Sequence, residues 1–146
     1  MTLPARSLAA CSLAIFLALY VVGAASHTPL RHGVQTLPLL LPIVLGFRQR
    51  ESAKWAALPC LVFWLLIMSL IWLFLLGWSH VARGHYSPVE IAMTMVIGVA
   101  CLSGIAVGLR WPAAQRPTAA WGSLLVSLAL QLAAFRVSLL PAISHR

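Results

Sequence analysis

Five long apolar stretches, separated by short polar turns, make up nearly the whole chain. The most apolar of them begins after Lys54 and carries no charged residue before Arg83. At 1.5 Å per residue, an apolar helix of about 20 residues can cross the roughly 30 Å hydrocarbon layer of a bilayer. The pattern therefore predicts an all-α integral membrane protein, a single domain with short loops whose five transmembrane helices cover residues 7–25, 29–47, 53–79, 88–109 and 118–140.

The second stretch is the weakest of the five, because Pro38 and Pro42 interrupt it. If Thr28 caps the helix, the stretch runs from Pro29 to Phe47 and is just long enough to span. Each proline removes a backbone donor, so we expect a kinked or broken helix here. If this stretch does not span, the bundle has four transmembrane helices.

The first stretch has two interpretations. A cationic start at Arg6, an apolar core and the small residues at 23–25 describe a secretory signal peptide. The next apolar stretch begins only a few residues later, which favours a retained helical hairpin. Both interpretations place the amino end in the cytoplasm.

Composition agrees with a membrane protein. Of the 146 residues, 62% are hydrophobic and 8% are charged, against roughly 25% charged residues in an average soluble domain. Ten Lys and Arg face two acids, and on a soluble chain this excess would suggest nucleic acid. Here the basic residues lie in the turns between apolar stretches. We therefore expect contact with anionic lipid headgroups and no nucleic-acid partner.

The distribution of basic residues predicts an orientation. Cytoplasmic loops carry an excess of Lys and Arg. The turns on the two sides of the membrane can therefore be compared by the number of basic residues that each side holds. With five spans and a cytoplasmic amino end, the external side has Arg31, Arg83 and Arg146. The cytoplasmic side has twice as many: Arg6, Arg48, Arg50, Lys54, Arg110 and Arg116.

The fourth stretch carries two local signals. Ser87-Pro88-Val89-Glu90 is a capping box, which explains Glu90 structurally; the alternative is a proton or cation site at the membrane surface. Ala100, Gly104 and Gly108 recur every four residues, a spacing that lets another helix approach closely. That helix could belong to the same chain, to a second copy or to another membrane protein.

The fifth stretch carries a polar face. Ser123, Ser127 and Gln131 are four residues apart, and a polar ribbon in lipid must face other helices or water. Arg136 lies near the end of the stretch, where its side chain can extend to the headgroups. A buried functional Arg136 is the alternative.

The histidines are the candidate metal ligands. His27 and His32 lie in one predicted external loop, His80 and His85 in another, and His145 near the carboxyl end. Imidazole is a common zinc and copper ligand, so a cluster of these rings could hold a metal. Interfacial histidines without a ligand are the simpler interpretation, and we predict no cofactor. The three cysteines lie inside apolar stretches and show no metal-ligand spacing.

A resemblance can be added to this pattern. The prolines and leucines of residues 38–42, the basic turn after them, Lys54-Trp55-Ala56 and Glu90-Ile91 resemble a family of small bacterial membrane proteins known only as a domain of unknown function. The resemblance covers about Leu37 to Arg110. It implies a bundle of apolar helices and brings no catalytic residues. With the Ala-, Leu- and Arg-rich composition, it places the chain in a bacterial inner membrane.

The sequence leaves two functions open. The chain has no Asp and only two separated Glu, so triads and carboxylate pairs are excluded, and we predict no enzyme. The first hypothesis is a non-enzymatic accessory or assembly subunit that acts through helix–helix contacts. The alternative is a small transporter or metal-handling protein that uses the external histidines.

Overall fold

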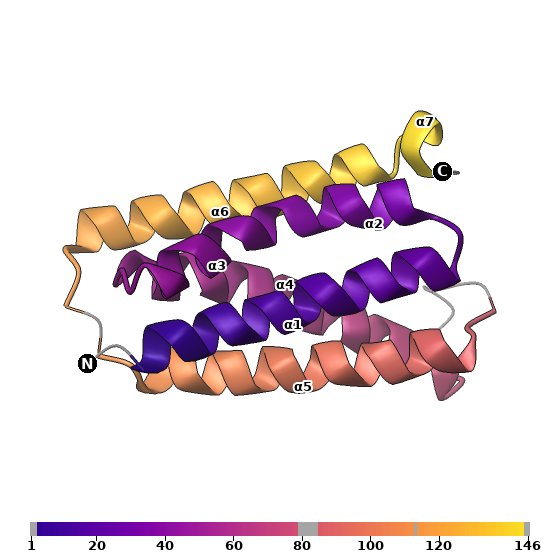
Figure 1. Ribbon diagram of the computed structural model, residues 1–146, viewed down its shortest axis with the longest axis horizontal. Helices are drawn as coiled ribbons and strands as arrows, with labels where there is room; N and C mark the ends of the chain where they lie inside the picture. The colour runs from indigo at the N-terminus through magenta and orange to yellow at the C-terminus, as the bar shows by residue number, and fades with distance from the viewer. Residues whose placement is uncertain (1–2, 79–84, 113, 145–146) are drawn as a thin grey trace.

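The chain folds as a bundle of long helices. The computed structural model describes residues 3–78, 85–112 and 114–144, and in these ranges it contains helices and turns but no strand. The helices lie side by side along the long axis of the molecule (Figure 1). Their bounds are α1 Leu3–Ala25, α2 Pro29–Thr36, η1 Leu37–Leu39, α3 Leu40–Phe47, α4 Ser52–Leu75, α5 Pro88–Arg110, α6 Pro117–Ser138 and α7 Pro141–Ser144.

Within the described residues, five segments are long and apolar enough to cross a membrane, as predicted. The second is α2, η1 and α3 taken together, from Pro29 to Phe47. The predicted break is confirmed: the chain tightens into a 3₁₀ turn at Leu37–Leu39, where Leu37 N–H donates to the Val34 carbonyl. Since Pro38 and Pro42 cannot donate, the tighter turn supplies bonds that a regular helix would lose there.

Some helix ends differ from the expected ones. The third span ends at Leu75 rather than at 79, because Gly77 takes a left-handed conformation (φ +76°) and Trp78 N–H turns back to the Leu73 carbonyl at 2.9 Å. The last long helix ends at Ser138 rather than at 140, and the short α7 then begins at Pro141. The first helix begins earlier than expected, at Leu3.

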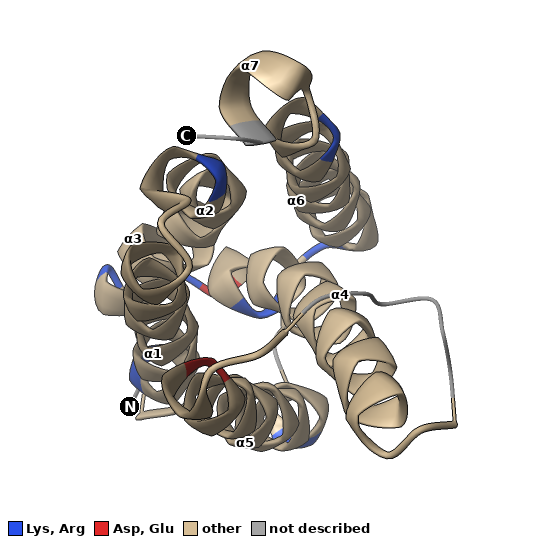
Figure 2. Cartoon of the chain, turned by 90° about the vertical axis from the view of Figure 1, so that its right-hand side faces the viewer, with Lys and Arg blue, Asp and Glu red and all other residues tan. Residues whose placement is uncertain are grey.

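Each long helix packs against several others. Helix α1 packs along α5, and α4 packs against α5, α3 and α6. Helix α6 packs against α4, α2 and η1, so it lies on the far side of the bundle from α5, as the end-on view shows (Figure 2). The core between α1, α4 and α5 is built from Leu8, Ile15, Leu61, Trp64, Met68, Ile97 and Cys101.

The small-residue stripe of α5 is used within the chain. Gly104 is so close to its neighbours that a Cβ would lie 2.8 Å from Leu61 Cδ1 of α4 and 3.2 Å from Cys11 Cβ of α1. At Gly108 a Cβ would lie 2.9 Å from Leu58 Cδ2, and Ala100 is buried as well. The small residues of this stripe therefore let α5 pack closely against α4 and α1.

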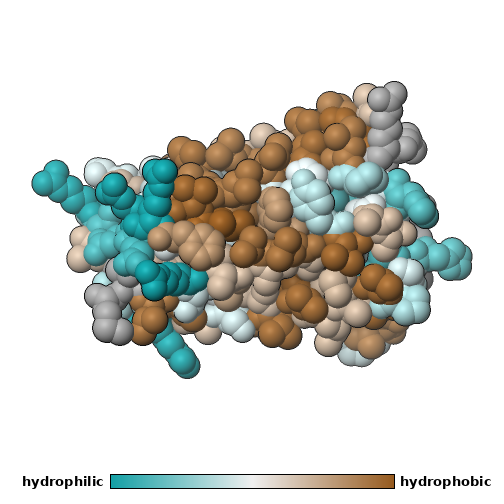
Figure 3. Space-filling view, in the orientation of Figure 1, coloured by the Kyte–Doolittle hydropathy of each residue, from teal (hydrophilic) through white to brown (hydrophobic). Residues whose placement is uncertain are grey.

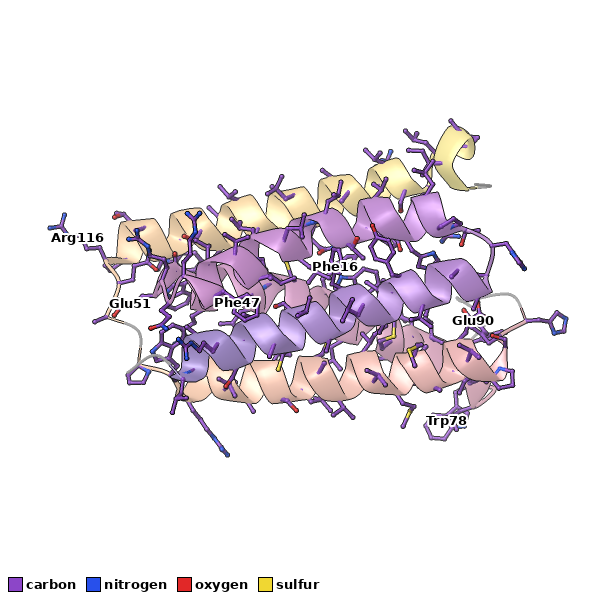
Figure 4. All side chains as sticks on the ribbon, viewed as in Figure 1. Phe16, Phe47, Glu51, Trp78, Glu90 and Arg116 are labelled. Atoms are coloured by element: carbon purple, nitrogen blue, oxygen red, sulfur yellow. The ribbon has the colours of Figure 1, made fainter. Side chains whose placement is uncertain are left out.

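The two ends of the bundle differ in charge. We call the end that holds the turns 48–51 and 111–116 the basic end, and the end that holds residues 26–28 and 85–87 the histidine end. Hydrophilic residues gather at both ends of the molecule, and an apolar belt separates them (Figure 3). Glu51 and Arg116 lie at the basic end, and Glu90 and Trp78 lie at the histidine end (Figure 4). This arrangement is that of a multi-pass membrane protein.

Candidate functional site

A cavity of about 490 Å³ opens at the histidine end, and we call it the vestibule. Residues from α1, α2, α4, α5 and α6 line it, so every spanning segment contributes. Its polar residues include Arg31, His32, Gln35, Tyr86, Glu90 and Thr94. Its apolar residues include Leu19, Trp64, Met68, Ile71, Ile97 and Phe135. The volume lies within the range of about 300–1,000 Å³ that small-molecule sites occupy.

Arg31 is the least satisfied charge of the vestibule. It lies in the first turn of α2, where the helix dipole disfavours a cation and the free backbone N–H groups favour an anion. Its side chain is half-buried, and its Nε atom is fully covered without a hydrogen-bond partner among the described residues. An unpartnered guanidinium N–H in such surroundings is suited to a carboxylate or phosphate oxygen.

Glu90 lies across the cavity from α2 and has a structural role. The Ser87 N–H donates to Glu90 Oε2 at 2.7 Å, and the Glu90 N–H donates to Ser87 Oγ at 3.2 Å. The predicted capping box is therefore confirmed. The carboxylate also lines the vestibule. Burial and the Glu90 charge raise the pKa of Tyr86, so its phenol stays protonated near neutral pH.

The histidines are divided between the cavity and the surface. His32 Nδ1 lies 3.2 Å from Thr28 Oγ1 and 3.1 Å from the Thr28 carbonyl, so the preceding turn holds its ring. His32 and His85 both line the vestibule, whereas His27 is exposed in the turn after α1. His80 and His145 lie outside the described residues. Within the described ranges, no three His, Cys, Asp or Glu side chains are grouped to hold a metal. The predicted metal site stays a prediction.

The polar face of α6 turns into the bundle below the vestibule. Ser127 and Gln131 are 1% and 0% exposed, and Ser123 is half-buried. Near the helix end, Gln35 Nε2 donates to Ser138 Oγ at 2.9 Å, and Ser138 Oγ donates to the Phe135 carbonyl at 2.7 Å. Both amide atoms of Gln131 and the hydroxyl of Ser127 have no such partner among the described residues.

Arg136 does not take part in this polar face. Its side chain is exposed, two residues before the end of α6. This position suits a side chain that reaches the headgroup layer.

A second cavity, of about 240 Å³, lies at the basic end between the starts of α4 and α6. Trp55, Gln115, Ala120, Trp121 and Leu124 line most of it. Trp55 Nε1 and Gln115 Oε1 are covered without a described hydrogen-bond partner. The neighbouring Lys54 is held in place, because its Nζ donates to the Trp111 carbonyl at 2.6 Å and lies 4.9 Å from the centroid of the Trp55 ring.

Sequence reasoning identified only part of this site. It singled out His32, His85 and Glu90, but it counted Arg31 only as an external basic residue and did not consider Gln35, Tyr86 or Thr94. Gln35 could have been found, because an amide side chain inside an apolar stretch needs a polar partner. Thr94 is less visible in sequence: its hydroxyl donates to the Ile91 carbonyl at 2.7 Å and accepts from Trp72 Nε1 at 3.1 Å.

The fold and the vestibule define a multi-pass membrane protein with a polar-mouthed cavity at one end. Comparison with known proteins adds no relative: no family model, curated protein or solved structure matches the chain. The resemblance drawn from residues 37–110 therefore stays a prediction.

Proposed function

We propose that the protein binds a small amphiphile with an anionic head group in the vestibule. The observation that carries the proposal is the covered Nε–H of Arg31, which has no hydrogen-bond partner among the described residues and lies at the start of α2, beside the apolar lining of the vestibule. The head group would accept hydrogen bonds from the guanidinium and from the free N–H groups of the first turn of α2. An apolar tail would lie along Trp64, Met68 and Phe135.

The surroundings of the two charged residues, Arg31 and Glu90, favour an anionic ligand over a cationic one. Glu90 already accepts the Ser87 N–H, and it lies in the first turn of α5, where the helix dipole stabilises a carboxylate. Arg31 has neither of these advantages, because it lies at the same position of α2 with the opposite charge. A ligand anion would therefore remove the larger electrostatic penalty.

We further propose that the histidine end faces outward from a bacterial inner membrane. Six basic residues lie at the start of α1 and in or beside the two turns of the basic end: Arg6, Arg48, Arg50, Lys54, Arg110 and Arg116. This excess supports a cytoplasmic basic end in contact with anionic lipids. The vestibule would then take its ligand from the external side. This is the transporter alternative of the sequence analysis, now with an anionic amphiphile as the ligand.

The accessory or assembly role stays a prediction. One of its supports in the sequence, the stripe of Ala100, Gly104 and Gly108, packs against α1 and α4 of the same chain. A membrane-protein partner or a second copy would have to use another face. Metal handling also stays a prediction, since it depends on His80.

A binding experiment tests the vestibule proposal. We suggest the protein in nanodiscs of a zwitterionic lipid, with three probes of equal chain length: dodecanoate, a dodecyl phosphate and the neutral monododecanoyl glycerol. We expect the two anions to raise the melting temperature and the neutral probe to have little effect. Comparing dodecanoate with the dodecyl phosphate shows whether the site prefers a carboxylate or a phosphate head group.

The matched variants are Arg31→Gln and Arg136→Gln. A hydrogen bond to a charged group contributes about 1.5–3 kcal/mol, so Arg31→Gln should weaken anion binding roughly 10- to 150-fold. Arg136→Gln removes an exposed Arg from the same end of the bundle, outside the vestibule lining, and should leave binding unchanged. If the neutral probe binds as tightly as the anions, or if both variants lose the same amount of anion affinity, the anion site is disproved.

A further inference from the structure

The two cavities open at opposite ends of the bundle and share one face of α6. Phe135 lines the vestibule, and Leu124 lines the cavity at the basic end. Ser127 and Gln131 fall between them at steps of three and four residues, so all four side chains lie on one face. Leu124 and Phe135 are eleven helical steps apart, which is roughly 16 Å at helical rise.

The polar groups between the cavities are unsatisfied in this conformation. Gln131 Oε1 and Nε2 and the Ser127 hydroxyl are covered too completely for water to reach them, and they have no hydrogen-bond partner among the described residues. Inside a bilayer such groups are costly, because neither lipid nor apolar side chains can hydrogen-bond with them. A conformation in which they are hydrated would remove this cost.

Helix α6 is the element best placed to reach such a conformation. It has the smallest buried share of the five spanning segments. It packs against α4 and against the broken segment α2–η1, rather than being enclosed by the core between α1, α4 and α5. A break in a transmembrane helix is tolerated where it is buried in protein or lines a water-filled space. Here the break faces α6.

We propose that the α6 face of Leu124, Ser127, Gln131 and Phe135 is a translocation route for the polar part of a solute, closed in this conformation. Movement of α6 away from α4 and η1 would join the two cavities and let water reach Ser127 and Gln131. The lining between the cavities is neutral, so it can accept hydrogen bonds from, and donate them to, a head group without trapping it by charge. The inference rests on the proposed function only for the identity of the solute.

Cysteine labelling tests the route without any ligand. A methanethiosulfonate reagent reacts with ionised thiols in water, and a thiol that faces lipid is not ionised. The test variant is Ser127→Cys, which is close to isosteric. The control is Val126→Cys, one residue away along α6, where Val126 is 54% exposed on the outside of the bundle. Mass spectrometry of the labelled peptides separates both from the native Cys11, Cys60 and Cys101.

We expect Ser127→Cys to react at least tenfold faster than Val126→Cys in proteoliposomes. Adding Gln131→Leu should slow the reaction at Ser127→Cys several-fold and raise the melting temperature, since leucine favours the closed, dry arrangement. An equal rate at the two cysteines, or a rate that Gln131→Leu leaves unchanged, would disprove the route. Neither of these results would bear on anion binding at Arg31, so the two proposals can fail separately.

Discussion

In the part of the chain that the structure describes, three turns place one residue in the left-handed backbone region. These residues are His27, Gln49 and Gly77, with φ of 55°, 56° and 76°. Each follows a helix that ends with the same pair of reversed hydrogen bonds; after α1, Thr28 N–H donates to the Gly23 carbonyl at 2.9 Å. Only Gly77 has the residue that this conformation prefers. The turn after α1 therefore retains backbone strain next to the vestibule.

We predict that His27→Gly stabilises the fold and that Gly77→Ala destabilises it. A non-glycine residue in the left-handed region costs about 1 kcal/mol, so each change should shift the free energy of unfolding by about that amount. A Cβ at Gly77 would meet no atom within 4 Å, so the effect there is purely conformational. Thermal unfolding in mild detergent measures both. A loss of stability in His27→Gly would mean that the imidazole makes an interaction, such as metal binding, that outweighs the strain.

Arg136 provides a second test at this scale. Its side chain is exposed near the end of α6, and Lys has a stem that can reach the same headgroups. We therefore predict that Arg136→Lys leaves stability and ligand binding nearly unchanged. If the guanidinium is instead held by a planar hydrogen-bonding partner, an ammonium cannot replace it. A loss in Arg136→Lys as large as that in Arg136→Leu would support that alternative.

At the scale of the element, α5 shows how local signals and packing combine. Its capping box fixes where the helix begins, and its small residues determine which face packs against α4 and α1. Gly98, on a neighbouring face of α5, packs directly against the Trp72 ring of α4. Because lipid and protein interior are equally apolar, close packing at these small residues does much of the work of holding the helices together.

We predict that Gly104→Leu damages the fold far more than Leu102→Ala. The new side chain would collide with Leu61 and Cys11, and overpacking of this kind costs about 1–3 kcal/mol or more. Leu102 is 56% exposed on the outer side of the same helix, so truncating it removes few protein contacts. Purification yield and melting temperature compare the two variants. Equal values would mean that the stripe does not position α5.

At the scale of the whole molecule, five spanning segments place the amino and carboxyl sides of the chain at opposite ends of the bundle (Figure 1). The basic turns then gather at one end, and the vestibule opens at the other. The orientation in the membrane follows if the positive-inside rule decides it.

We predict that a reporter fused after Arg50 or Arg116 behaves as cytoplasmic and that one fused after Arg146 behaves as external. The expectation follows from the excess of Lys and Arg at the basic end. Paired reporters, one active only in the cytoplasm and one only outside, provide the measurement and its control. A cytoplasmic carboxyl end would mean that one segment does not span, and the proline-broken Pro29–Phe47 is the first to examine.

The sequence by itself determined where the long apolar segments form helices, and it determined several of their ends. A chain in hydrocarbon must satisfy its backbone groups within each segment, so an apolar run of sufficient length has little choice but to form a helix. The capping box at Ser87 and the break at Pro38 are equally local, because they depend on residues within one turn of each other. These features could be predicted without knowing any neighbour.

Only the tertiary structure decided which faces meet and hence where the cavity lies. Spanning helices are apolar on all sides, so no hydrophobic stripe marks the face that packs. Arg31 of α2 and Glu90 of α5 both line the vestibule. Gln35 forms a hydrogen bond with Ser138, which lies 103 residues away in the sequence. The polar face of α6 was visible in the sequence. That Ser127 and Gln131 lie unpartnered between two cavities depends on how α6 packs against α4 and the broken second span, which no local pattern records.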